Sequence, residues 1–312
     1  MSYGNAVLTD QAKELRNIVE RNKKDKNKNK NKKLGHLKTL TILSGKGGVG
    51  KSNLSVNLAC ALAEQKKKVV LLDADLGLAN LDMLFGITAK YNLSHLIDGS
   101  KGLDEVLVPL ENNIWMLPGG SGIKELADLD EERLVELIDN IGFLEDRADV
   151  LLVDAGGGIH KSVLTFAAAA DTVVLVTTPE PTAIRDAYGL LKALKNSSEG
   201  KEKKDIVFVV NMANSEREGF EVANRLKMAA SQFLEISVSY IGYILKDSFV
   251  EQAVRVRKPF YRLFPDSPAA RCIKSIVETL SVAPSGGVIG VSQPRGLKAF
   301  FYRLARGYFT GR

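Results

Sequence analysis

Hydrophobic and polar residues alternate along this chain in two different rhythms. From residue 37 onward, short apolar runs such as VVLL (69–72) and VLLV (150–153) recur. Such runs are typical of strands that are buried on both faces. Between them lie longer segments with apolar residues at helical spacing. The runs predict strands at 38–44, 68–73, 113–117, 149–154, 172–177, 205–211 and 237–244. The longer segments predict helices at 50–65, 131–143, 161–169, 183–196, 217–233, 247–256 and 267–280.

This alternation predicts an α/β fold with a doubly wound, mostly parallel sheet that binds ligands beyond the carboxyl ends of its strands. The 312 residues suffice for one large domain of this kind. No apolar run approaches the roughly 18–20 residues that a membrane span needs, and no secretory signal begins the chain. Cys60 and Cys272 lie far apart without metal-ligand spacing, so we expect a reducing, cytoplasmic location.

The segment SGKGGVGKS (44–52) follows the first predicted strand and precedes the first predicted helix. Its last eight residues fit G-x-x-x-x-G-K-[ST], the P-loop. In such a loop, backbone N–H groups surround phosphates at the positive end of a helix. Lys51 would neutralise phosphate charge, and the Ser52 hydroxyl would bind Mg²⁺. The residues predicted to hold the nucleotide here are Gly45, Lys46, Gly47, Gly48, Val49, Gly50, Lys51, Ser52 and Asn53.

Acidic residues end two further predicted strands. Asp75 lies in LLDADLGLANLD (71–82), where it could polarise the attacking water or hold a Mg²⁺-bound water. Asp154 lies in ADVLLVDAGGGI (148–159), the placement of an acid that approaches Mg²⁺ through its water shell. The three glycines after Asp154 suggest a backbone close to the γ-phosphate. Taken alone, acids at the end of the second strand could equally be helix caps, and we interpret His160 as a surface or interface residue.

The loop KGGVGKS, with its additional Lys46, resembles the deviant Walker A motif of the MinD/ParA family of P-loop ATPases. The resemblance implies that Lys46 reaches the partner's phosphates across an ATP-dependent homodimer, and that Asp75 positions the hydrolytic water. It also implies that Asn211 hydrogen-bonds adenine, since the segment around it lacks the N/T-K-x-D element of GTPases. The expected cofactors are ATP/ADP and Mg²⁺. By the same resemblance, Lys46, Lys51 and Asp75 are catalytic, and Ser52, Asp75 and Asp154 are the metal-binding residues.

The net charge of +6 is distributed unevenly along the chain. Residues 1–38 hold eleven Lys/Arg and four Asp/Glu, residues 295–312 hold five and none, and the body between them has a net charge of −6. Near the carboxyl end, bulky apolar residues share one helical face, and cations occupy the rest. Such a helix is typical of a membrane interface, although a helix packed on the domain would show the same pattern. The residues of the apolar face are Leu297, Phe300, Phe301, Leu304 and Tyr308.

Residues 8–21 predict a short amphipathic helix, and NKKDKNKNKNKK (22–33) predicts a flexible tether. The motif D-Q-A-x-x-L-R resembles the start of the flagellar number regulators of the MinD-like branch (FlhG, FleN or YlxH). That resemblance implies stimulation of the SRP-type GTPase FlhF by this motif, contact with flagellar switch (C-ring) proteins, and a cytoplasmic protein that binds reversibly to the inner face of the cell membrane. The matching residues are Asp10, Gln11, Ala12, Leu15 and Arg16.

The sequence thus predicts five regions. They are a partner-binding motif (1–21), a tether (22–36), a MinD-like ATPase domain (37–282), a linker (283–291) and an amphipathic membrane-targeting helix (292–312). Three alternatives stay open. A division-site MinD shares the domain and the tail, and a ParA-like partition ATPase would bind DNA, against which the acidic body argues. A scaffold that binds nucleotide without hydrolysing it would not need both carboxylates.

Overall fold

The computed structural model describes residues 37–75, 81–126, 129–197, 205–282 and 296–309. The chain divides into two units, residues 1–35 and 36–312. The predicted N-terminal motif and tether, the linker before the C-terminal helix and residues 76–80 of the acidic segment 71–82 therefore lie outside the described residues. Among the helices that are described, none is long and apolar enough to cross a membrane.

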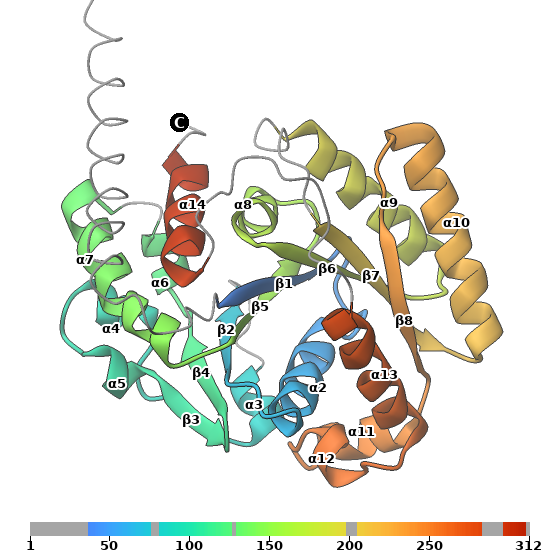
Figure 1. The fold of residues 1–312 in the computed structure, drawn as a ribbon, viewed down its shortest axis with the longest axis horizontal. Helices are drawn as coiled ribbons and strands as arrows, with labels where there is room; N and C mark the ends of the chain where they lie inside the picture. Colours follow the sequence, from blue (N-terminus) through green and yellow to red (C-terminus); the bar gives the residue numbers. More distant parts are fainter. Residues whose placement is uncertain (1–36, 76–80, 127–128, 198–204, 283–295, 310–312) are drawn as a thin grey trace, which may run out of the picture. The chain divides into compact units, whose positions relative to one another are not determined.

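One eight-stranded sheet forms the centre of the described domain (Figure 1), in the order β3-β4-β2-β5-β1-β6-β7-β8. All neighbouring strands pair in parallel except β3, which runs antiparallel to β4 at the edge. The strands are β1 (Lys38–Ser44), β2 (Val69–Ala74), β3 (Val108–Glu111), β4 (Ile114–Pro118), β5 (Val150–Gly157), β6 (Thr172–Thr177), β7 (Asp205–Ala213) and β8 (Ser239–Leu245).

Helices cover both faces of this sheet (Figure 1). The longer ones are α2 (Lys51–Glu64), α7 (Glu131–Gly142), α8 (Lys161–Ala169), α9 (Pro181–Asn196), α10 (Glu216–Leu234), α11 (Ser248–Arg255), α13 (Pro268–Val282) and α14 (Leu297–Phe309). The short ones are α3 (Leu81–Phe85), α4 (Leu93–Ile97), α5 (Leu103–Val106), α6 (Gly122–Glu125), the 3₁₀ turn η1 (Phe143–Asp146) and α12 (Phe260–Leu263).

The strands are apolar throughout because each face of the sheet packs against a separate layer. In β5, Leu151 and Val153 belong to the core that also contains Phe166 of α8 and Phe300 of α14. The alternate residues Val150 and Leu152 belong to the second core, beneath α2 and α13. Side chains of a strand alternate between faces, so a strand buried on both sides needs apolar residues at nearly every position.

The predicted α/β fold with a doubly wound, mostly parallel sheet is confirmed, and each of the seven predicted strands is present. The sequence did not predict β3, which contains Pro109 and is only partly buried. Proline lacks a backbone donor and is tolerated here because β3 lies at the edge of the sheet. A strand of four residues is also too short to show a clear hydrophobic pattern. Helices α3 to α6 and α12 were also missed, because one turn of helix is too short to show a helical period.

Candidate active site

The P-loop lies between the carboxyl end of β1 and the first turn of α2. Gly50 has a φ of +89° in the loop, and a side chain there would meet the amide nitrogen of Asn211 at 2.3 Å. At the start of the loop, a Cβ on Gly45 would lie 2.2 Å from the backbone of Asp186 in α9. Glycine is therefore required at both ends of the loop, for its conformation at one end and for its close packing on α9 at the other.

Lys51 and Asp154 are brought together at this edge of the sheet, where both are buried. Asp154 ends the apolar part of β5 and is 1% exposed. The Ser55 hydroxyl, one turn into α2, donates to Asp154 Oδ1 over 3.0 Å. Burial raises the pKa of Asp154 to about 6, opposed by hydrogen bonds from Ser52 and Ser55 and by the Lys51 charge. The carboxylate, the hydroxyl of Ser52 and the ammonium of Lys51 thus meet in one place, as the sequence predicted.

This donor set fits a magnesium ion that is shared with a nucleotide. Mg²⁺ takes oxygen ligands and usually keeps several waters, with one or two protein groups and the phosphates completing its shell. Ser52 and Asp154 are the protein oxygens here. Within the described ranges, no three His, Cys, Asp or Glu side chains gather into a metal site of their own. The arrangement therefore fits an ion that arrives with phosphates.

Asp75 follows β2 and faces the glycine loop after Asp154. A Cβ built on Gly156 would lie 3.5 Å from Asp75 Oδ1. Its neighbour Asp73 is buried, and its Oδ2 accepts a hydrogen bond from the backbone N–H of Leu81 at the start of α3. The two acids thus have different environments: Asp73 binds the backbone at the start of α3, and Asp75 lies beside the loop of Asp154. Residues 76–80, which follow Asp75, lie outside the described residues.

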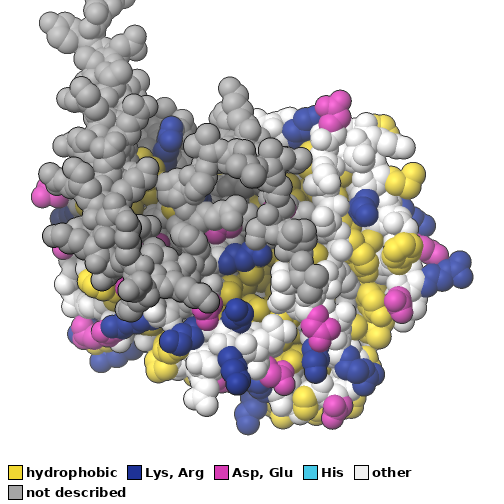
Figure 2. All heavy atoms as spheres, viewed as in Figure 1, with side chains coloured by type: hydrophobic (Ala, Val, Ile, Leu, Met, Phe, Trp, Pro, Cys, Tyr) yellow, Lys and Arg dark blue, Asp and Glu magenta, His cyan; other side chains and the backbone are white. Residues whose placement is uncertain are grey.

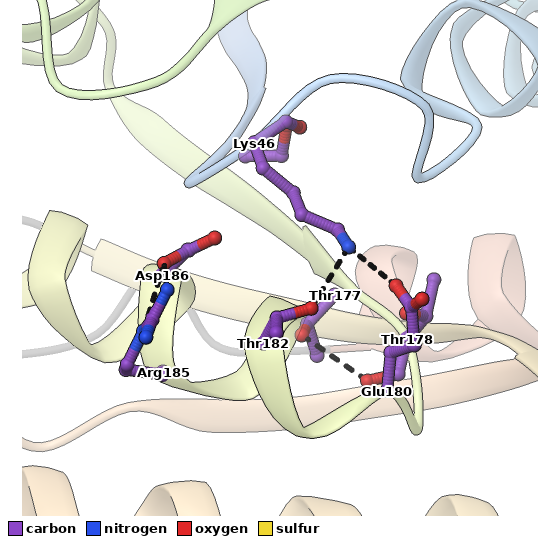
Figure 3. A network of polar contacts seen from close by, with 8 residues as sticks. Lys46, Thr177, Thr178, Glu180, Thr182, Arg185 and Asp186 are labelled. Carbon is purple, nitrogen blue, oxygen red and sulfur yellow. Dashed lines mark hydrogen bonds and ion pairs between the residues drawn. The ribbon is translucent and has the colours of Figure 1, made fainter.

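Lys46 does not extend away from its own chain, as its expected role across a dimer would require. Its Nζ forms an ion pair with Glu180, the residue before α9, and donates to Thr182 Oγ1 over 3.1 Å (Figure 3). The Lys46 side chain is 29% exposed and that of Glu180 is 63% exposed. In this structure the lysine therefore binds the amino end of α9. The sequence prediction missed these partners, although Glu180 and Thr182 follow a predicted strand end at the same edge of the sheet.

Asn211, near the end of β7, is hydrogen-bonded to the P-loop. Its Nδ2 donates to the Val49 carbonyl over 2.8 Å, and its Oδ1 accepts from the N–H of Met212 over 2.9 Å. The side chain is 8% exposed. Asn211 therefore lies beside the loop and connects it to β7, a contact that the sequence did not predict. Its expected hydrogen bonds to adenine stay a prediction.

The C-terminal helix packs on the body, which is the alternative to the membrane-bound helix that the sequence favoured. Leu297, Phe300, Phe301 and Leu304 are at most 1% exposed, and α14 as a whole packs against α7 and α8 (Figure 1). The apolar face that the sequence predicted is therefore buried in this structure, and membrane targeting by this helix stays a prediction. The cause is a complementary apolar surface on the two helices, in which Phe166 meets Phe300 with ring centroids 6.4 Å apart.

Cations of the same helix also bind the body. Lys298 pairs with Asp139 of α7 at 2.7 Å, and Arg303 pairs with Asp171 at 3.4 Å. Lys161, the first residue of α8, donates to the Tyr308 carbonyl over 3.1 Å. The Tyr308 hydroxyl is buried and has no hydrogen-bond partner among the described residues. The docked helix thus has apolar and charged contacts along its length and one unsatisfied polar group near its end.

Comparisons with known proteins agree with this geometry. Residues 40–260 match the CobQ/CobB/MinD/ParA nucleotide binding domain family. Antiactivator FleN of Pseudomonas aeruginosa is 38% identical over 276 residues, which cover 88% of this chain and 96% of FleN. Flagellum site-determining protein YlxH of Helicobacter pylori is 37% identical over 274 residues, 87% of this chain and 91% of YlxH. Among solved structures, the MinC:MinD cell division protein complex of Aquifex aeolicus has 26% identity and a TM-score of 0.61 over 82% of this chain and 99% of that chain.

Proposed function

We propose that this chain, which belongs to the CobQ/CobB/MinD/ParA family of nucleotide-binding domains, is an ATP-driven switch that regulates the number or placement of flagella. The chain is an ATPase of this family. The observation that supports this chemistry is the convergence at the P-loop of Lys51 at the start of α2, Asp154 in β5 and Asp75 directly after β2. The flagellar assignment is supported by the similarity to FleN and YlxH, which extends over nearly the whole chain.

In the proposed reaction, ATP binds with its phosphates against the P-loop amides and the Lys51 ammonium. Asp75 orients a water for attack on the γ-phosphorus, and the bond to ADP breaks as the new bond to water forms. Magnesium, when bound with the nucleotide, neutralises phosphate charge beside Ser52 and Asp154. Asn211 keeps the loop attached to β7, and the proposal assigns it the recognition of adenine. Positioning and charge neutralisation are the protein's main contributions to this kind of reaction.

The switch we propose is the assembly of two copies of the chain around ATP. Lys46 of each copy reaches the phosphates bound by the other, so the dimer forms only when both sites hold ATP. This role for Lys46 is supported by its place in the loop, directly before the double glycine. Hydrolysis then returns the chain to the monomer. Slow turnover suits such a cycle, because the rate of ATP hydrolysis sets how long the dimer, the active state of the switch, persists.

The dimer, in this proposal, binds the inner face of the cell membrane through two copies of α14. The apolar face is buried against α7 and α8, so the helix must undock before it meets lipid. The nucleotide site and α14 are connected through α8. This helix begins seven residues after Asp154, and its first residue, Lys161, binds the end of α14. A change in the loop that follows Asp154 would therefore act directly on the contact that holds Tyr308.

The N-terminal region completes the proposal. We assign residues 1–21 to binding an SRP-type GTPase of the FlhF kind, residues 22–36 to a tether, 37–282 to the ATPase domain, 283–291 to a linker and 292–312 to membrane targeting. Proteins of the flagellar switch are further proposed partners. This assignment is supported by the D-Q-A-x-x-L-R motif, whose residues are Asp10, Gln11, Ala12, Leu15 and Arg16.

The flagellar role is tested with the partner GTPase. Full chain and a chain that begins at Asn22 are added to a purified FlhF-type GTPase from the same cell, and GTP hydrolysis is measured. We expect stimulation by the full chain and none by the shortened one. The shortened chain must keep its own ATP turnover, which controls for folding. Equal GTP hydrolysis with both chains would remove the flagellar assignment and leave a division-site role in its place.

A further inference from the structure

The contact between Lys46 and α9 opposes the role that we propose for this lysine. Lys46 Nζ points along its own subunit toward the start of α9, where the Glu180 carboxylate and the Thr182 hydroxyl bind it (Figure 3). A lysine held in this way cannot at the same time reach the phosphates of a second copy. Its ammonium must first leave both acceptors.

Both sides of this contact are held in place by the surrounding structure. On the loop side, Gly45 packs so closely on α9 that even a methyl group would meet the backbone of Asp186. On the helix side, Pro181 is the first residue of α9, and its fixed φ suits the first turn of a helix. Glu180 and Thr182 flank that proline. The lysine and its two acceptors are therefore brought together by rigid backbone on both sides.

We propose that Glu180 and Thr182 form a latch that holds Lys46 within its own subunit and so sets the threshold for assembly of two copies. The inference rests on the proposed function, in which Lys46 acts across the dimer. Assembly then requires an exchange, in which each lysine gives up one carboxylate and one hydroxyl for the phosphates bound by its partner. The phosphates carry more negative charge than a single carboxylate, so a second ATP-bound copy of this chain can compete successfully for the lysine.

The exposure of the pair limits how strong the latch can be. With side chains 29% and 63% exposed, the ion pair is screened by water and belongs to the weak, surface class. Such pairs shift an equilibrium by about 1.4- to 5-fold each. A dimer breaks two of them, so removing the latch is expected to tighten assembly by about 2- to 30-fold. A latch of this strength raises the ATP or protein concentration needed for assembly without preventing it.

The test measures the dissociation constant of the dimer with a non-hydrolysable ATP analogue, by sedimentation velocity over a range of full-chain concentrations. We expect Glu180→Gln to dimerise about 2- to 30-fold more tightly than the unchanged chain. Thr182→Val, which removes the second acceptor, should shift assembly less but in the same direction. Asp104→Asn is the control for loss of a surface carboxylate, because Asp104 forms an ion pair with Arg147 before β5, at the amino edge of the sheet, that is more exposed than the pair of Lys46 and Glu180.

A second background separates the latch from a general effect of charge. In Lys46→Ala chains, Glu180→Gln should leave unchanged whatever assembly remains at the highest protein concentrations, because the lysine that it releases is absent. The latch is overturned if Glu180→Gln weakens or does not change the dimer, or if it acts equally in the Lys46→Ala background. A different result marks failure of the proposed function: the unchanged chain stays monomeric with the analogue at every concentration, which overturns the dimer and the latch together.

Discussion

The buried carboxylate of Asp154 suits magnesium binding but lowers the stability of the folded chain. The carboxylate is almost completely buried, and its pKa is raised from 3.8 to about 6, mainly by burial. An acid with a raised folded pKa binds its proton more tightly in the folded chain than in the unfolded chain. Stability therefore falls as the pH rises from about 4 to about 6, and it stays lowered above that range. The ionised carboxylate suits Mg²⁺ and nucleotide but destabilises the protein without them.

Asp154→Asn is accordingly expected to raise the free energy of unfolding at pH 7.5, and to raise it less at pH 5. The difference between the two gains should be about 1 kcal/mol, since one pKa unit corresponds to ~1.4 kcal/mol. Urea unfolding of both chains without nucleotide at the two pH values measures this. Asp205→Asn is the control, because that side chain is exposed. A gain of equal size at both pH values, or a loss at pH 7.5, would contradict the assignment of a buried, ionised Asp154.

The sequence predicted which residues form the candidate site but not the partners that hold them. Lys51, Ser52 and Asp154 could be predicted because a local motif or a strand end marks each of them. The partners of Lys46 and Asn211 could not, because Glu180 lies 134 positions from Lys46 and Val49 lies 162 positions from Asn211. Ser55 was missed for a related reason. The hydrogen-bond partner of a serine inside a helix cannot be predicted until the strand that it faces is known.

At the scale of elements, burial decided which predictions succeeded. Strands buried on both faces leave an unbroken apolar run, so the ends of β1, β2 and β6 were predicted to within one residue. The C-terminal helix was predicted with the correct apolar face, yet its sequence could not say what covers that face. Lipid and the apolar surface of α7 and α8 both favour apolar side chains on the helix, because both exclude water from them.

The end of α14 has a defect that favours undocking. The hydroxyl of Tyr308 is buried without a partner among the described residues, and leaving such a group unsatisfied costs about 1–3 kcal/mol. Tyr308→Phe removes the hydroxyl and should stabilise the docked helix. We expect backbone amides of α14 to exchange hydrogen several-fold more slowly in this variant, in the full chain with ADP. Tyr302→Phe, on the same helix, is the control. Unchanged or faster exchange in Tyr308→Phe would show that this hydroxyl does not weaken docking.

At the scale of the whole molecule, the charge distribution separates the body from its ends. The body carries 27 Lys/Arg and 33 Asp/Glu, whereas the last eighteen residues carry five cations and no acid. On the face drawn in Figure 2, acidic and basic side chains are interspersed over the part that is not grey. A body of this kind gives little general attraction to anionic surfaces. Attraction to an anionic membrane therefore has to come from the ends of the chain.

In the proposed cycle, docking of α14 makes assembly the event that controls membrane binding. A single short helix with a few cations binds lipid weakly, since each cation contributes ~1 kcal/mol near an anionic surface. The helix must also first separate from α7 and α8. Two helices on one dimer act together, and such pairing can raise avidity by about 10²- to 10⁴-fold. ATP binding, assembly and membrane attachment would thus follow one another in that order.

Co-sedimentation with anionic lipid vesicles tests this account most directly. The full chain and a chain that ends at Val291 are each spun with vesicles in the presence of ATP or of ADP, and parallel samples without lipid detect aggregation. The account predicts that only the full chain with ATP sediments with the vesicles. Equal binding with ATP and ADP would contradict control by nucleotide, and binding that survives the truncation would contradict attachment through α14.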